Sequence, residues 1–272
     1  MVSGVSADSN PPDSQPDKSH STLFNPTPAS QLRDLNSDRP NVTQGPYTID
    51  AGHLQVESSF LEFTHSSDSR GHADLLNALP TNIRLGVLSN FEIELAIDPY
   101  QNAVSYTRSP AVRQEGFGDT QLGAKLNFWG DDSGATAFGV QPFLKLPTGA
   151  AGISNHHVEG GVILPFSFAI TDGLSVAVMA EADVVRNQFN TGYGVNNVES
   201  IVLQKSLSKA TSVYVEYVGV APVDAGTTFA SAVDIGGVTQ LNPNLQLDVG
   251  INLGISRSLP NFTVFSGITF RI

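Results

Sequence analysis

The chain contains no cysteine, which excludes a disulfide scaffold, a cysteine-ligated metal site and a thiol nucleophile. It also lacks any apolar stretch near the roughly 20 residues that a membrane-spanning helix needs, because the apolar run at 162–170 is short and interrupted by Pro165. If this protein spans a membrane, it therefore does so with strands. Basic residues are scarce: 14 Lys and Arg stand against 26 Asp and Glu, a formal net charge of -12. This balance disfavours nucleic acid as a partner, because binding a phosphate backbone requires cations.

The N-terminal part of the chain differs in composition from the rest. Residues 1–48 are rich in Ser, Pro, Asp and Asn, a composition that buries too little apolar surface to offset the entropy of ordering. We therefore divide the chain into a polar, partly disordered segment at 1–48, with disorder in about the first 20 residues, and one domain at 49–272. The start lacks a basic region followed by an apolar region, so we expect that an export signal has been removed or replaced.

From about Ala51 onward, apolar and polar residues alternate in segments that are separated by short Asn, Asp, Gly and Ser clusters, which is typical of strands and turns. In 245–254 the odd positions are all aliphatic and the even positions are all polar or Gly. We expect strands at 51–65, 73–87, 91–103, 117–129, 135–147, 157–170, 174–186, 195–207, 211–220, 229–241, 245–255 and 261–272.

The connections between these strands alternate in length, with five short turns interleaved with six longer loops. This arrangement predicts an all-β, up-and-down antiparallel barrel of about twelve strands in the bacterial outer membrane, with both termini periplasmic. Most of the strands reach the roughly 9 to 11 residues that a tilted strand needs to cross a bilayer. A soluble β-sandwich, in which the aliphatic faces pack against each other, is the alternative.

Several short motifs resemble, in order and spacing, the outer-membrane transporter family named after the MetA pathway of phenol degradation. They are Asp38-Arg39-Pro40, Gly52-His53 with Gln55 and Glu57, Leu79-Pro80-Thr81 leading to Arg84, Gly116-Phe117-Gly118-Asp119, and Leu146-Pro147-Thr148-Gly149. The resemblance implies an outer-membrane barrel that transports small molecules, with small hydrophobic or aromatic compounds as candidate solutes.

If the aliphatic face meets lipid, the polar face lines the lumen, where charged side chains tune selectivity. The residues expected there are His53, Gln55, Glu57, Arg84, Glu92, Glu94, Gln121, Lys125, Gln141, Lys145, Glu181, Asp183, Glu216, Asp248, Asn252 and Arg271. Many of them could instead form ion-pair networks that brace a narrow barrel, because buried charge is costly unless it is partnered.

The polar segment just before the first strand is a candidate plug of the lumen. It carries Arg33, Asp34, Asp38 and Arg39. Arg39 could pair with Glu57, Glu92 or Glu94 if the segment folds back into the barrel. An ordinary periplasmic tail is the alternative.

Neither a catalytic constellation nor a metal or cofactor site is evident in the sequence. The adjacent His156 and His157 point to opposite sides of a strand and lack a third ligand, and no Gly-x-Ser-x-Gly motif is present. We therefore predict a non-enzymatic channel for passive uptake of small molecules. The alternative is a plugged structural or binding barrel without transport. The expected partners are outer-membrane lipid and small solutes, and a monomer is favoured.

Overall fold

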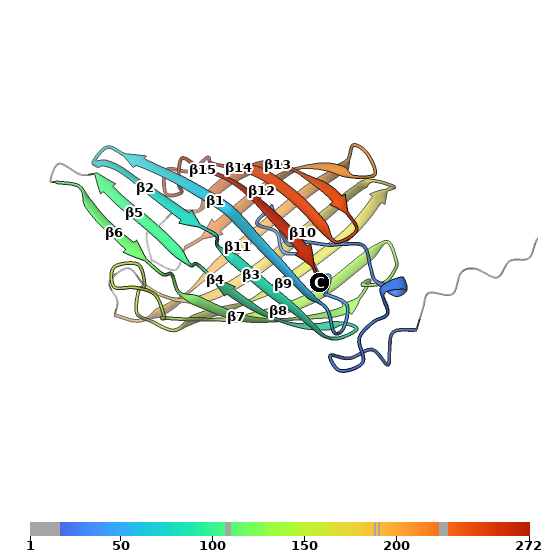
Figure 1. The fold of residues 1–272 in the computed structure, drawn as a ribbon. Coiled ribbons are helices and arrows are strands. Elements are labelled where there is room, and N and C mark those ends of the chain that lie inside the picture. Colours follow the sequence, from blue (N-terminus) through green and yellow to red (C-terminus); the bar gives the residue numbers. More distant parts are fainter. Residues whose placement is uncertain (1–16, 107–109, 188, 190, 223–227) are drawn as a thin grey trace, which may run out of the picture.

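Fifteen strand segments close into one antiparallel barrel in the computed structural model, which describes residues 17–106, 110–187, 189, 191–222 and 228–272 (Figure 1). Closure comes from pairing of the first segment with the last. The segments are β1 (Leu54–Asp68), β2 (Gly71–Ala78), β3 (Thr81–Leu88), β4 (Phe91–Ile97), β5 (Tyr100–Tyr106), β6 (Val112–Gly116), β7 (Thr120–Trp129), β8 (Thr136–Leu146), β9 (Glu159–Thr171), β10 (Leu174–Arg186), β11 (Tyr193–Ser206), β12 (Thr211–Ala221), β13 (Ala230–Asn242), β14 (Leu245–Gly254) and β15 (Phe262–Arg271).

Three strands of the barrel wall are each built from two segments. Leu79 and Pro80 separate β2 from β3, Asp98 and Pro99 separate β4 from β5, and residues 117–119 separate β6 from β7. Proline has no N–H to donate to a ladder, and Leu79 adopts a φ of 57°. Counted as continuous wall strands, the segments make the twelve-stranded antiparallel barrel that the sequence pattern predicts, and this prediction is confirmed.

The expected strand boundaries are wrong in one region, because the strands expected at 91–103 and 117–129 leave 104–116 as a connection. There β5 and β6 form a hairpin in which residues 101–105 pair with 112–116. The sequence of β6 includes Arg113, Gln114 and Glu115, so the strand lacks the apolar alternation that would reveal it. Residues 107–109, between the two strands, lie outside the described part of the chain.

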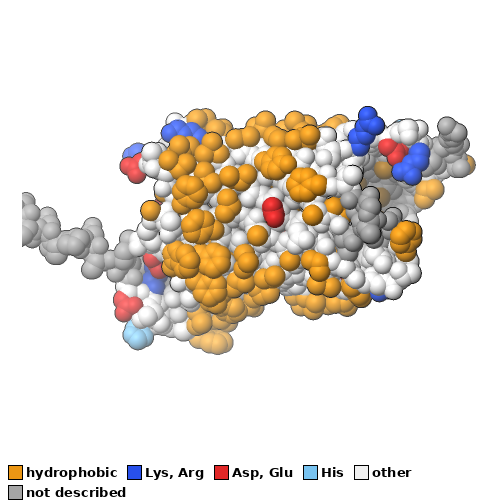
Figure 2. Space-filling model, turned by 180° about the vertical axis from the view of Figure 1, so that it is seen from behind, with side chains coloured by type: hydrophobic (Ala, Val, Ile, Leu, Met, Phe, Trp, Pro, Cys, Tyr) orange, Lys and Arg blue, Asp and Glu red, His pale blue; other side chains and the backbone are white. Residues whose placement is uncertain are grey.

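The polar face of the strands lies inside the barrel and the aliphatic face lies outside. In β14, Gln246 and Asp248 are buried, whereas Val249 and Leu253 are exposed. Apolar side chains accordingly cover much of the face shown in Figure 2, and exposed apolar residues on strands around the barrel continue this belt. The closed barrel and this outward belt overturn the alternative of a soluble sandwich, because a sandwich would bury its aliphatic faces.

The two ends of the barrel differ. Gln55 near the start of β1 pairs with Arg271 at the end of β15, so both terminal strands meet at one end, which we call the terminal end. The β3–β4, β7–β8, β9–β10, β11–β12 and β13–β14 turns lie there, and the opposite end is called the loop end. Within the described residues, no helix is long and apolar enough to cross a membrane.

The chain before β1 enters the barrel from the terminal end. A short 3-10 helix, η1 (Ala29–Gln31), precedes residues 33–50, which we call the inserted segment. This segment hydrogen-bonds to inward-facing side chains on β7, β9, β12, β14 and β15. The expected disorder of about the first 20 residues falls mainly on residues 1–16, which lie outside the described range.

Candidate functional site: the lumen and its inserted segment

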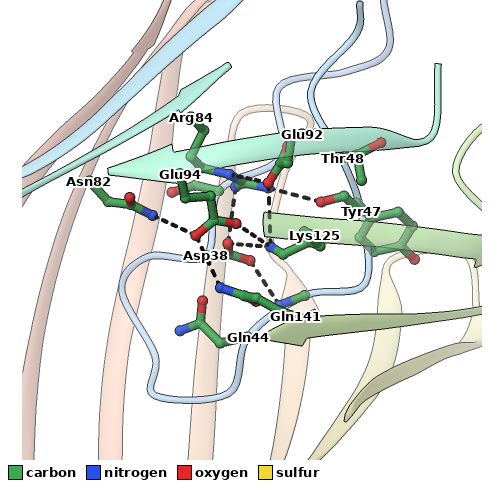
Figure 3. A network of polar contacts seen from close by, with 12 residues as sticks. Asp38, Gln44, Tyr47, Thr48, Asn82, Arg84, Glu92, Glu94, Lys125 and Gln141 are labelled. Atoms are coloured by element: carbon green, nitrogen blue, oxygen red, sulfur yellow. Dashed lines mark hydrogen bonds and ion pairs between the residues drawn. The ribbon is translucent and has the colours of Figure 1, made fainter. Parts of the chain in front are cut away.

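A buried ion-pair cluster joins the inserted segment to β1, β3, β4 and β7. Arg84 lies 2.7 Å from both Glu57 and Glu92, and 3.1 Å from Asp38. The guanidinium also donates to the carbonyl oxygen of Tyr47 at 2.9 Å (Figure 3). The side chains of Arg84, Glu57 and Glu92 are at most 2% exposed. Each charge is therefore compensated by opposite charge from a different part of the chain.

Lys125 supplies the second cation of this cluster. Its ammonium donates to Asp38 at 2.5 Å and lies 3.7 Å from Glu94, and its side chain is fully buried. Burial alone would raise the pKa of Asp38, but Arg84 and Lys125 outweigh it and hold that pKa below its ordinary value. Asp38 is therefore the residue through which the inserted segment is bound to the cationic side of the lumen.

Arg39 binds the opposite wall of the lumen. Its guanidinium forms a two-pronged contact with Asp248 at 2.7 and 3.1 Å, and it donates to Ser59 at 2.5 Å. The group also lies 5.8 Å from the centre of the Phe265 ring. A Cβ atom on Gly267 would stand 2.3 Å from the guanidinium, so only glycine leaves room for it. The expected pairing of Arg39 with Glu57, Glu92 or Glu94 is wrong, because Arg84 and Lys125 already neutralise those acids.

A third attachment lies at the centre of the inserted segment. The backbone N–H groups of Val42 and Thr43 donate to the two carboxylate oxygens of Glu216 at 2.8 and 2.7 Å. The Thr43 hydroxyl also contacts Glu216 and lies 2.6 Å from the hydroxyl of Ser200. A carboxylate that accepts several N–H and O–H donors binds them strongly. The segment is thus attached to three separate parts of the barrel wall.

At the terminal end, a further group of charges holds the entry of the inserted segment. Arg33 lies 2.9 Å from Asp132 and 3.5 Å from Asp131, both of which belong to the β7–β8 turn. Lys18 bridges Asp50 and Asp132 at 3.0 and 2.7 Å. Burial would raise the pKa of Asp132, but hydrogen bonds from Arg33 and Lys18 place it below the ordinary value. Burial raises the pKa of Asp131 despite the nearby Arg33.

Acidification is expected to release the inserted segment. The pKa values of Asp38 and Asp132 are lower in the folded protein, so their stabilising contribution is complete above the ordinary value near 4 and is lost as the pH falls through the lowered values. Protonation of Asp131 instead stabilises the folded protein, since it removes a buried charge. We expect single-channel conductance to stay constant from pH 7 to 5 and to rise below about pH 4.

A deletion variant lacking residues 1–45 is the control for this pH experiment. It has no Asp38 and no Arg33, so its conductance is expected to show no such step. A rise already complete at pH 5, or the same step in the deletion variant, would contradict this assignment.

Most of the residues that the sequence pattern places in the lumen face the barrel interior in the structure. Ten of them are buried: Gln55, Glu57, Arg84, Glu92, Glu94, Lys125, Gln141, Glu216, Asp248 and Arg271. Gln121, Lys145, Glu181, Asp183 and Asn252 are partly exposed on the same inward faces. His53 differs, because it lies in the turn before β1 and its ring contacts the carbonyl oxygen of Thr27 at 2.8 Å. Asp34 lies at the terminal end, beside the mouth of the lumen.

Sequence reasoning missed several charged residues of this site. Lys18, Asp50, Asp131 and Asp132 lie in turns and tails, where charge ordinarily indicates only solvent exposure, so the sequence offers no signal for them. Asp234 is different: it is 1% exposed, faces the lumen and alternates with Val233 and Ile235 in β13. The alternation used for the other strands would have found it. Within the described residues, no group of three or more His, Asp or Glu side chains is arranged to hold a metal ion.

The inserted segment divides the free space of the lumen. A cavity of about 340 Å³ on its terminal-end side is lined by residues of β11 to β14, including Gln204 and Tyr214. A cavity of about 290 Å³ on its loop-end side is lined by residues of β1, β3 and β4, including Glu62. Residues 39–41 line both cavities. This short stretch, Arg39-Pro40-Asn41, is therefore the septum between the two compartments.

A family model described as "Putative MetA-pathway of phenol degradation" matches residues 37–272. The chain belongs to this family. Its matched range includes most of the inserted segment as well as the barrel, which confirms the resemblance based on the short motifs. No sequence among curated proteins matches the chain.

Solved structures with a similar fold are outer-membrane barrels. The COG4313 outer membrane channel from Pseudomonas putida F1 has a TM-score of 0.60 at 11% identity, covering 81% of this chain and 95% of that one. The NanC porin has a TM-score of 0.51 at 9% identity, covering 80% and 100%. The translocator domain of the autotransporter NalP from Neisseria meningitidis has a TM-score of 0.50 at 10% identity, covering 81% and 88%. At these identities the similarity is one of fold.

Proposed function

We propose that this family member is a bacterial outer-membrane channel for the passive passage of small molecules, and that its inserted segment forms the constriction. The observation that carries the proposal is the pair of lumenal cavities separated by the septum Arg39-Pro40-Asn41. The barrel wall is closed by backbone pairing, so a solute can pass only through the lumen. Within the lumen, the septum and the side chains that hold it separate the two compartments. An enzymatic role has no comparable support.

The apolar belt and the arrangement of the connections support the placement in the outer membrane. Short turns at the terminal end and longer connections at the loop end match barrels whose termini face the periplasm. The expected partners are then lipid on the outside and solutes in the lumen. The family description, which refers to phenol degradation, supports small aromatic compounds as candidate solutes.

Substitution of Arg39 tests the septum directly. Arg39→Ala removes the contacts with Asp248, Ser59 and Phe265, and it shortens the side chain that separates the two cavities. We expect the conductance in planar bilayers to rise about two- to threefold, because pore size and charge set conduction. Asp248→Asn is expected to act in the same direction but more weakly, since it keeps the size of the side chain.

Lys145→Ala is the matched control, since it also removes an inward-facing cation. Lys145 pairs with Asp119 at 3.1 Å and with Glu159 at 2.7 Å, and neither acid belongs to the inserted segment. Equal conductance changes in the Arg39 and Lys145 variants would show a general charge effect and contradict a septum. If none of the variants conducts ions, the alternative of a plugged structural barrel is favoured.

A further inference from the structure

A second loop-end cavity, of about 340 Å³, lies beside the middle of the inserted segment. It is bounded by Val42 and Gln44 of that segment and by inward-facing residues of β3, β4 and β7 to β10. Asn82, Glu94 and Gln141, seen together in Figure 3, form one side of it. Gln44, Asn82 and Ala96 line both this cavity and the loop-end cavity that borders the septum.

The polar side of this cavity presents acceptors without donors. The side-chain amide groups of Gln141 and Asn82 both donate to Glu94, at 3.0 and 3.3 Å. A carboxylate accepts only, so each amide must direct its NH₂ group toward Glu94 and its oxygen elsewhere. Among the described residues, no donor reaches Gln141 Oε1 or Asn82 Oδ1, although both oxygens are buried and Gln141 is only 3% exposed. Such buried acceptors call for a donor.

A carboxylate lies on the far side of the same cavity. Glu181 of β10 lines it and hydrogen-bonds to Asp183, and the ion pairs formed among the described residues do not include Glu181. The neighbouring inward-facing residue on β10 is another acid, Asp183. This part of the wall therefore attracts a cation that the fold itself does not supply.

The remaining surface of the cavity is apolar. Phe143 of β8 and Ile163 of β9 lie next to each other in the wall, and Val42 of the inserted segment lines the cavity as well. Gly161 of β9, which pairs with Phe143, has no space for a side chain, since a Cβ atom would stand 2.9 Å from the Phe143 ring and 2.3 Å from Asp183. The aromatic face of Phe143 suits an apolar body that carries a positive charge.

From these features we infer that the cavity binds small primary amines in their protonated form, with an aromatic or aliphatic body. The ammonium group faces Glu181 and donates hydrogen bonds to Gln141 Oε1 and Asn82 Oδ1 once these side chains turn their covered oxygens toward it, while the body packs on Phe143 and Ile163. The inference rests on the proposed function in one respect: the cavity is taken to lie on the path of the solute.

Three ligands of similar size and different head group test this site. Benzylamine is a protonated amine at neutral pH, benzyl alcohol is a neutral donor and acceptor, and benzoate is an anion. We expect calorimetry on the full chain in detergent to show benzylamine binding about tenfold more tightly than benzyl alcohol, with no binding of benzoate. Equal affinities for the amine and the alcohol, or tighter binding of benzoate, would overturn the inference.

Two variants locate the site. Glu181→Gln is expected to weaken benzylamine about tenfold and to leave benzyl alcohol unchanged, because it removes the charge and keeps the shape. Asp98→Asn is the matched control, because Asp98 is an acid that lines the 290 Å³ cavity and not this one. Gln141→Met removes the buried acceptor, with Gln204→Met in the terminal-end cavity as its control. If a variant and its control lose equal affinity for benzylamine, the assignment of the site is wrong.

Swelling of liposomes that contain the protein separates this inference from the channel itself. The rates are taken relative to protein-free liposomes, because benzyl alcohol and neutral benzylamine cross lipid unaided. Equal protein-dependent rates in both solutes, without preferential binding, would support the channel and refute the amine site. Preferential binding of benzylamine without protein-dependent swelling would support the site and refute passive passage.

Discussion

Deletion of residues 1–45 is expected to raise the single-channel conductance about three- to tenfold, because a twelve-stranded barrel without internal filling is wider than the side-chain-filled eight-stranded barrels. The deletion removes Asp38, Arg39 and Thr43, through which the inserted segment is attached to three parts of the wall. The wall itself remains closed, since β1 begins at Leu54 and pairs with β15. The change is measured as the step size in planar bilayers under identical salt and voltage.

Deletion of residues 1–16 is the matched control for this experiment. It shortens the chain at the same end but leaves in place every contact that the described residues make with the inserted segment, so its conductance should equal that of the full chain. If the longer deletion gives no larger steps than the shorter one, the inserted segment is not the constriction.

Substitution of Arg84 is expected to have the largest effect on stability. Arg84→Met leaves Glu57 and Glu92 buried without their nearest cation, and breaking a buried pair in this way costs about 3–5 kcal/mol. The matched control is Lys145→Met, whose partly exposed pairs should contribute only about 0–1 kcal/mol. Both are measured by urea titration of protein folded into lipid bilayers, with the fluorescence of Trp129, the single tryptophan, as the signal.

A double variant separates buried charge from lost packing. Arg84→Met combined with Glu92→Gln removes one of the uncompensated acids, so it should recover part of the loss. Equal stabilities of the Arg84 and Lys145 single variants would contradict the bracing role of the cluster. So would a double variant whose loss of unfolding free energy exceeds the summed losses of Arg84→Met and Glu92→Gln.

The sequence predicts the barrel well because lipid imposes a strict alternation on its strands. Leu245 to Gly254 reads as one aliphatic and one polar face, and the structure places those faces outside and inside. The strand β6 was not predicted, because Arg113 and Glu115 lie in it and a strand beyond the apolar belt needs no alternation. The interruptions at Pro80 and Pro99 follow from the missing N–H of proline, although pairing across them keeps the wall continuous.

The interior of the barrel is predictable only in part. Alternation indicates which residues face inward, such as Arg84, Lys125 and Glu216, but it does not indicate which of them pair. Arg39 shows this limit: its partner, Asp248, is more than 200 residues away along the chain, and nothing local in the sequence connects them. The acceptors Gln141 and Asn82 are likewise visible as polar residues, whereas their lack of donors depends on the three-dimensional arrangement.

The most direct test of the account is the current through one channel whose inserted segment can be fixed and released. The hydroxyls of Thr43 and Ser200 lie 2.6 Å apart, and the chain has no cysteine of its own, so Thr43→Cys with Ser200→Cys gives a single reversible link between the segment and β11. We predict that the oxidised variant keeps its small conductance below about pH 4, whereas the same channel opens at that pH once the disulfide is reduced. Equal currents before and after reduction would contradict the central claim that movement of this segment controls the path through the barrel.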